Sequence, residues 1–111
     1  MIEKTVLDYL NSVLSVPTFM EKDGTEPSEF VLIHKGDSTT ENFVTTAMIV
    51  AESHGSSLFD AATLNEEVKK AMTNLHATAQ VSACRLVTDY NYTDTASKGY
   101  RYQAVFNITH Y

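Results

Sequence analysis

The sequence QVSACRLVTDYNY, residues Gln80–Tyr92, is a strand-like run rich in β-branched and aromatic residues. A second run of the same kind, GYRYQAVFNITHY (Gly99–Tyr111), follows after the turn-rich stretch Thr93–Lys98, and together they predict a long β-hairpin. Five of the six tyrosines of the chain lie on these two runs: Tyr90, Tyr92, Tyr100, Tyr102 and Tyr111. This is more aromatic surface than a chain of 111 residues needs for its own core. The hairpin therefore favours assembly with other subunits over catalysis.

The two faces of this hairpin differ in character. One face of the second run is apolar enough to pack on helices, and it carries Tyr100, Tyr102, Ala104, Phe106, Ile108 and His110. Neither face of the first run is clearly of the solvent type, so we expect helices on one side of the sheet and a neighbouring subunit on the other. The candidate interface residues are Tyr90, Tyr92, Tyr100, Arg101, Tyr102 and Tyr111. A simpler alternative stays open, in which the tyrosines only pack against one another across the hairpin.

The first half of the chain predicts one helix and three strands. Apolar residues recur at helical spacing from the N-terminus, and the helix should end before Pro17, because proline disfavours helical geometry in the residue that precedes it. The predicted buried stripe of this helix is Ile2, Val6, Leu10, Val13 and Leu14. The predicted extended segments that follow are Thr18–Glu21, Glu29–Lys35 and Asn42–Glu52. We expect Gly36–Glu41 to be a polar loop between the last two.

A second helix is predicted between these strands and the hairpin. Ser57 is a candidate N-cap with Asp60 in the first turn, and the helix should run to about His76. Its predicted buried face is Leu58, Ala61, Ala62, Val68, Ala71, Met72 and Leu75. Glu66 and Lys70 are four residues apart on the outer side, a pair worth about 0.2–0.5 kcal/mol. The element order α-β-β-β-α-β-β then predicts a single α+β domain over residues 1–111, with a mainly antiparallel sheet and two helices on one face.

The composition fits a folded protein with an acidic surface. Fourteen acidic and eight basic residues give a formal net charge of −6. Nucleic-acid binding relies on clustered basic residues, and the densest basic spot is Lys69-Lys70, so no sequence-specific nucleic-acid partner is expected. The single cysteine, Cys84, cannot form an intramolecular disulfide and fits a reducing compartment. The first residues show no signal-peptide pattern, and no apolar run approaches about 20 residues, so we expect no membrane partner and synthesis in the cytosol.

The residues that usually carry chemistry show no catalytic or metal-binding spacing. None of the four histidines fits the spacings HxH, HxxxH or HExxH, so solvated or capping side chains are expected. These histidines are His34, His54, His76 and His110. Cys84 lies inside a predicted strand, where an inert core residue is expected, and Asp89 and Asp94 flank the hairpin turn, where carboxylates commonly cap the backbone. We therefore expect no catalytic residue, no metal site and no cofactor, and a protein that is not an enzyme.

Three stretches of the chain resemble a known family. They are MIEKTVLDYLNSVLSVPTFME (Met1–Glu21), LFDAATLNEEVKKAM (Leu58–Met72) and DYNYTDTASKGYRYQAVFNITHY (Asp89–Tyr111). Together they resemble small tail proteins of long-tailed bacteriophages and prophages of Gram-positive bacteria, and the likeness covers essentially the whole chain. The size and element order are similar to the tail terminator or head–tail joining family. The likeness rests on the strand–helix–strand pattern and the YxYTD…YRYQAVF ending.

The resemblance implies a structural role in the virion. In that family a sheet flanked by helices assembles into a hexameric ring at the head-proximal end of the tail tube. Such a ring caps the growing tube, stops its polymerisation and offers a surface to the filled head. The implied partners are copies of the chain itself, the tail-tube protein and head connector proteins, with assembly in the cytoplasm of the bacterial host. An acidic surface would suit a passage for DNA, because like charges repel.

Two other functions stay open as alternatives. One is another minor tail or tail-tube-like structural protein, which a long loop that orders on polymerisation would favour. The other is a small cytosolic ligand-binding module, which a closed apolar pocket between helices and sheet would favour. In a ring, each subunit uses two different patches. We place one on the terminal hairpin and the other on the Asn42–Glu52 strand or the Glu21–Glu29 connection.

Overall fold

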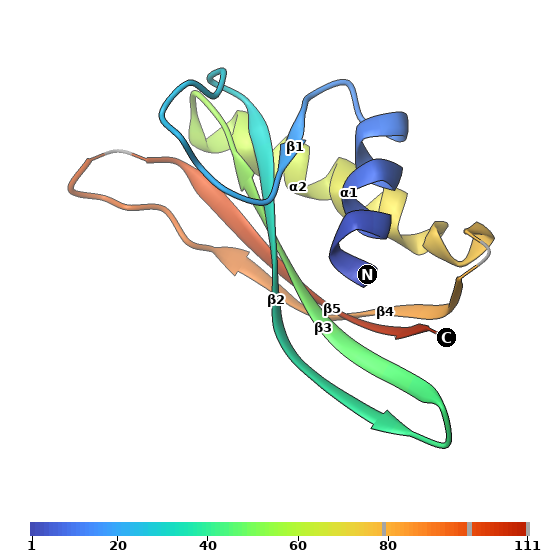
Figure 1. The fold of residues 1–111 in the computed structure, drawn as a ribbon. Helices are drawn as coiled ribbons and strands as arrows, with labels where there is room; N and C mark the ends of the chain where they lie inside the picture. Colours follow the sequence, from blue (N-terminus) through green and yellow to red (C-terminus); the bar gives the residue numbers. More distant parts are fainter. Residues whose placement is uncertain (79, 98, 111) are drawn as a thin grey trace.

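The elements of the protein follow one another in the predicted order, with one short 3-10 helix added after the second α-helix. The computed structural model describes residues 1–78, 80–97 and 99–110. Its elements are α1 (Ile2–Val13), β1 (Thr18–Phe19), β2 (Phe30–Glu41), β3 (Val44–His54), α2 (Leu58–Thr73), η1 (Leu75–Ala77), β4 (Val81–Asn91) and β5 (Arg101–His110). Figure 1 shows both α-helices on one face of the sheet, so the predicted α+β architecture is confirmed.

The sheet has the strand order β1-β2-β3-β5-β4. β1 is parallel to β2, whereas all other neighbouring strands are antiparallel. The central pair, β3 and β5, runs without a break from Thr45 opposite His110 to His54 opposite Arg101. β4 forms one edge of the sheet. The other edge is only partly covered, because β1 pairs with no more than Val31 and Leu32 of β2.

The core lies between the sheet and the two helices. Alternate residues of β3 and β5 point to the helices, as the period of a strand requires. The fully or almost fully buried members of this cluster are Ile2, Val6, Leu10, Val31, Ile33, Ala47, Ile49, Ala51, Leu64, Val68, Met72, Leu75, Val81, Ala104, Phe106 and Ile108. The face of the last strand that was expected to pack on helices does so through its three apolar residues, Ala104, Phe106 and Ile108. Each large side chain buried here contributes about 1.5–3 kcal/mol.

The buried stripe of helix α1 is shorter than predicted. Ile2, Val6 and Leu10 are buried, but Val13 is 50% exposed. In the last turn Leu14, and not Val13, turns toward the core. The side chain of Asn11 then fixes the exit of the chain, because its Oδ1 accepts from the backbone N–H of Thr18 at 2.8 Å and its Nδ2 donates to the Thr18 carbonyl at 3.2 Å.

Helix α2 begins at the predicted cap and ends earlier than expected. The hydroxyl of Ser57 accepts from the backbone N–H of Asp60 at 3.1 Å. Leu58 was expected in the buried face but lies in the exposed first turn, whereas Leu64 and Asn65, which the periodicity did not single out, are buried. The helix ends at Thr73, so the His76 region forms η1 instead.

The ion pair on α2 also differs from the prediction. Lys69, not Lys70, meets Glu66, with 2.9 Å between Nζ and the carboxylate. The reason lies outside the helix. Lys69 also reaches Asp89 of β4 at 2.9 Å, so its side chain is drawn toward two carboxylates at once.

The predicted loop at Gly36–Glu41 is wrong: β2 continues through it to Glu41. The pairing with β3 shifts between Lys35 and Ser38 and then resumes to the end of the strand. A two-residue turn, Asn42 and Phe43, joins the strands, so β3 begins at Val44. This part of the hairpin projects beyond the helices, as Figure 1 shows. A strand that is exposed on both sides can be polar throughout, which is why its sequence is typical of a loop.

Two irregularities interrupt β4 and explain why neither of its faces looked solvent-exposed. The register against β5 shifts between Val81 and Ala83 and again between Leu86 and Thr88. Each shift inserts one extra residue and reverses the alternation that follows, as β-bulges do. Residues directly opposite one another share a face. The side that faces the helices is therefore made of Val81, Cys84, Leu86 and Asp89, opposite His110, Ile108, Phe106 and Ala104 of β5.

Candidate interaction surface

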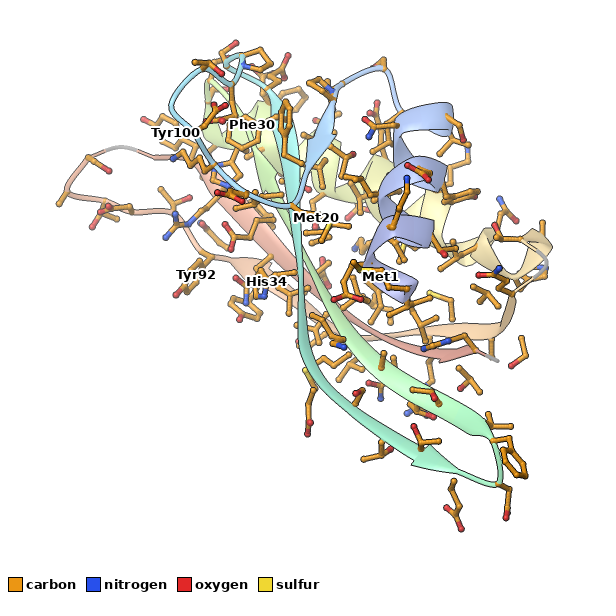
Figure 2. The ribbon with its side chains drawn as sticks, in the orientation of Figure 1. Met1, Met20, Phe30, His34, Tyr92 and Tyr100 are labelled. Atoms are coloured by element: carbon orange, nitrogen blue, oxygen red, sulfur yellow. The ribbon has the colours of Figure 1, made fainter. Side chains whose placement is uncertain are left out.

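The face of the sheet that carries no helix, here called the outer face, holds three of the six predicted interface residues. Tyr90, Tyr92 and Arg101 lie together at its end near the β4–β5 turn (Figure 2 labels Tyr92). The two tyrosine rings meet edge to face with 6.0 Å between centroids. The guanidinium of Arg101 lies over the Tyr92 ring, 4.7 Å from its centroid, and its Nε donates to the Tyr92 carbonyl at 2.9 Å. The tyrosines thus pack along one strand and against Arg101, and they stay 41% and 47% exposed.

The other three predicted residues lie elsewhere. Tyr102 is half-buried and pairs with Ser53 of β3, which belongs to the face covered by the helices. Tyr100 is half-buried just before β5, where its carbonyl accepts from the backbone N–H of Gly55 at 3.1 Å. Tyr111 lies outside the described residues. The tyrosine set is therefore divided between the two faces of the sheet, because the side chains of Tyr102 and Arg101 must point in opposite directions.

A charged cluster adjoins the exposed tyrosines, and the sequence prediction missed it. The carboxylate of Glu52 lies between two imidazoles: it accepts from Nε2 of His54 at 3.1 Å and lies 3.6 Å from Nε2 of His34. The hydrogen bond from His54, with the nearby charge of Arg101, holds the pKa of Glu52 below its ordinary value, although burial acts the other way. Figure 2 shows His34 on the same side of the sheet as Tyr92.

His54 corrects the expectation of solvated or capping histidines. It is only 8% exposed, and its ring stacks on Phe30 at 4.4 Å with an angle of 10° between the planes. The strand register places it directly opposite Arg101, so the Glu52 cluster and the tyrosines form one continuous surface. The available signal was the spacing of two residues between Glu52, at the end of the predicted strand, and His54 just beyond it, because such residues share a face where a strand continues.

The outer face is therefore polar and aromatic. Gln103 donates to the hydroxyl of Tyr90 at 2.6 Å, which fixes one ring in place. Val50 and Val105 lie almost buried in the middle of the face. Within the described part of the chain, no three His, Cys, Asp or Glu side chains are grouped so that they could hold a metal ion. A face with aromatic anchors and a rim of fixed charges resembles the composition of protein interfaces.

A second candidate surface is the tip of the β2–β3 hairpin, called here the arm (residues 35–48). The side chain of Phe43 is 96% exposed at its turn. Both turn residues have positive φ, 53° for Asn42 and 67° for Phe43. Asparagine tolerates this left-handed geometry, but a bulky aromatic residue rarely adopts it.

Three residues that the sequence analysis considered, Cys84, Asp94 and Asp89, have structural surroundings. Burial raises the pKa of the Cys84 thiol to about 11, so it stays protonated at neutral pH. Asp94 caps the hairpin turn as predicted, since its carboxylate accepts from the backbone N–H of Ala96 at 3.1 Å. Asp89 does not: it accepts from Asn65 Nδ2 and Lys69 Nζ, both at 2.9 Å, and so ties β4 to α2.

No protein-family model matches the chain, and no curated protein matches it in sequence. Neither of the described helices has the length and apolar character that crossing a membrane requires.

Proposed function

We propose that the protein is a structural subunit of a phage tail that assembles with copies of itself, of the tail terminator or head–tail joining type. The observation that carries this proposal is the asymmetry of the terminal hairpin. Its inner face packs against α2, whereas its outer face carries no helix and presents Tyr90, Tyr92 and Arg101. An uncovered face of aromatic anchors is what a subunit offers to a neighbour.

The contacts around the tyrosines favour binding in a second way. Arg101 and Gln103 already hold the rings of Tyr92 and Tyr90 in place. Side chains that are ordered before binding lose less conformational entropy when a partner covers them. The surface is therefore prepared for contact.

The role implied by the resemblance fits this surface. The ring, hexameric in the family that the sequence resembles, would cap the tail tube and meet the head connector. With a net charge of −6, the chain would not retain DNA that passes through such a ring. We place the protein in the virion, after assembly in the bacterial cytoplasm, with no catalytic, metal or cofactor site and no membrane or sequence-specific nucleic-acid partner. Another minor tail or tail-tube-like protein is the alternative within the same class.

A ligand-binding module is less well supported. Such a module would need a closed apolar pocket between helices and sheet. The groove with apolar lining described below lies between the two helices and is open to solvent.

The test is electron microscopy of particles from a phage or prophage that encodes the chain, with the gene deleted. We expect overlong or headless tails, because an uncapped tube continues to grow and cannot join a head. Expression of the wild-type chain in the same host should restore normal virions, and expression of the Tyr92→Ala variant should not. Normal virions from the deletion strain would contradict the proposed function.

A further inference from the structure

The arm ends in a side chain that the fold does not use. Phe43 is 96% exposed, and its φ of 67° is unfavourable for any residue with a bulky side chain. A glycine at this place would suit the turn better, since two-residue hairpin turns with positive φ favour Asn-Gly. A residue that breaks the local rule without a gain in packing points to function elsewhere.

A groove between the two helices exposes apolar side chains as well. It has a volume of about 390 Å³ and is lined by Tyr9, Val13, Leu14, Ser15, Glu67, Lys70, Ala71 and Asn74. Val13 at its wall is 50% exposed. Phe59, 77% exposed, lines an adjoining hollow that shares Ser15 and Glu67 with the groove. The groove thus offers an apolar wall and a nearby aromatic ring, which suit a phenyl side chain.

One charge on the arm and one on the rim of the groove are of opposite sign and lie free for contact. Glu41 immediately precedes the turn of the arm and makes no ion pair with another described residue. Lys70, on the rim of the groove, also makes none, because Lys69 is the residue that meets the neighbouring carboxylates Glu66 and Asp89. Glu67 is the one acid on the same rim. A free carboxylate beside Phe43 and a free ammonium beside the groove favour one orientation of contact.

The arm cannot reach the groove of its own chain. Figure 1 shows the tip of the arm at the bottom of the view and the C-terminal end of α1 near its top, so the two are well separated in one chain. A contact between them must therefore join two chains. Because the two patches differ, the contact is head-to-tail, the kind that closes into a ring when its rotation permits.

We propose that the arm of one copy docks in the groove between α1 and α2 of the next copy, with the ring of Phe43 against Val13 and Glu41 beside Lys70. This inference rests on the proposed function, because it adds a contact between neighbouring subunits to the one proposed for the outer face. The expected second patch was the Asn42–Glu52 strand or the Glu21–Glu29 connection; the proposed contact uses instead the tip of the β2–β3 hairpin and a groove between the helices.

Cross-linking of two cysteine variants tests the contact directly. The Phe43→Cys protein and the Val13→Cys protein carry tags of different size, so that a mixed dimer can be told from the two homodimers on a gel. They are mixed at equal concentration and treated with a short bismaleimide. We expect a mixed dimer as the main product. The matched control replaces Phe43→Cys by Ser97→Cys, in the exposed turn of the other hairpin, and should give only the background seen for wild-type protein, whose one thiol is half-buried.

Variants of the arm test the same contact without cross-linker. Sedimentation velocity over a concentration series should show self-association at least about tenfold weaker for Phe43→Gly than for wild type, since buried aromatic anchors dominate interface energy. The melting temperature of Phe43→Gly should not fall. Glu41→Lys and Lys70→Glu should each weaken association, and the double variant should recover it, because the pair is restored with reversed charges.

The outcomes separate this contact from the proposed function. Three results would each overturn the arm–groove contact. The main cross-linked product could join two Phe43→Cys chains, or the Ser97→Cys control could give the same yield as Phe43→Cys. The third is a double variant, Glu41→Lys with Lys70→Glu, that does not recover association. If deletion of the gene still gives overlong or headless tails, the structural role stands without it. If the strain without the gene makes normal virions but the mixed dimer still forms strongly, the arm–groove contact is supported and the proposed role in the tail is contradicted.

Discussion

Phe43 takes the second place of a two-residue hairpin turn, where φ is 67°. Left-handed backbone costs an ordinary residue about 1–2 kcal/mol, because the Cβ atom crowds the following carbonyl. Nothing in the packing of one chain offsets this cost, since the ring is almost fully exposed. The presence of phenylalanine in this turn therefore lowers the stability of the monomer, which is expected where a side chain serves a contact with another molecule.

Replacement of Phe43 by glycine should stabilise the isolated chain. Glycine removes the left-handed penalty but loses more conformational entropy on folding, so we expect a net gain of up to about 1 kcal/mol in the free energy of unfolding. Urea unfolding measures it. Phe43→Ala is the matched control and should give no comparable gain, because alanine keeps the Cβ atom. A loss of stability in Phe43→Gly would mean that the ring packs on its own chain.

Asp89 is a residue whose role the sequence did not indicate. Its carboxylate is the hydrogen-bond partner of Asn65 Nδ2, and Asn65 is only 1% exposed. Asp89→Ala should therefore lower the free energy of unfolding by about 1–3 kcal/mol, because a buried amide loses its acceptor. Chemical unfolding measures the loss. Glu66→Ala, which removes the other and more exposed partner of Lys69, should change stability by less than about 0.5 kcal/mol.

Glu52 should make stability depend on acid pH. The pKa of its carboxyl is lowered from 4.5, first by the hydrogen bond from His54 and then by the charges of His54, Arg101 and His34. A lowered folded pKa means that the unfolded chain binds the proton first. The stabilising contribution is thus complete above pH 4.5 and disappears as the pH falls through the folded value. The free energy of unfolding, measured from neutral to acid pH, should fall more steeply for wild type than for Glu52→Gln. An equal fall in the two proteins would contradict a stabilising role of the Glu52 carboxylate.

At the scale of elements, Gly55 permits the close approach of β3 to the start of α2. A Cβ atom at this position would lie 2.5 Å from the backbone nitrogen of Ala61, which cannot move without moving the helix. Gly55→Ala should therefore destabilise the fold by about 1–3 kcal/mol. Gly36→Ala is the control, because its Cβ would meet only the flexible side chain of Met48. Thermal unfolding of both variants measures the difference, and equal losses would mean that the helix adjusts freely.

The elements with one buried face were predictable, and those without one were not. The apolar stripe through Ile2, Val6 and Leu10 and the alternation through Ala104, Phe106 and Ile108 gave the correct elements, because one face of each is buried. The distal half of β2 has no buried face, so its residues show no alternation of apolar and polar side chains from which a strand could be predicted. In β4 the alternation is present but is reversed at each bulge, and only the pairing with β5 reveals where.

The candidate site was predictable only where its residues are neighbours along one strand or one hairpin. Tyr90, Tyr92 and Arg101 were identified from composition, and they do lie together on the outer face. Tyr102 was grouped with them, although alternation along β5 places it on the opposite face. The Glu52 cluster depends on strand register, since His54 meets Arg101 only across the β3–β5 pair. Contacts between residues distant in sequence cannot be read from local patterns.

At the scale of the whole molecule, the two faces of the sheet predict different consequences for two tyrosines. Tyr102→Ala removes a half-buried ring from the face covered by the helices and should lower the free energy of unfolding by up to about 3 kcal/mol. Tyr92→Ala removes an exposed ring and its contact with Arg101, worth about 0.5–1 kcal/mol at an exposed site. Thermal unfolding of the purified variants measures both changes.

Assembly should show the reverse order of effects. Tyr92→Ala is expected to fold almost normally and yet fail to restore normal tails in the deletion strain, because it lacks an anchor of the outer face. Tyr102→Ala should restore tails to the extent that it stays folded at the growth temperature. If Tyr92→Ala restores normal tails as well as wild type does, the outer face is not the surface that meets a neighbour, and the exposed tyrosines only stabilise their own hairpin.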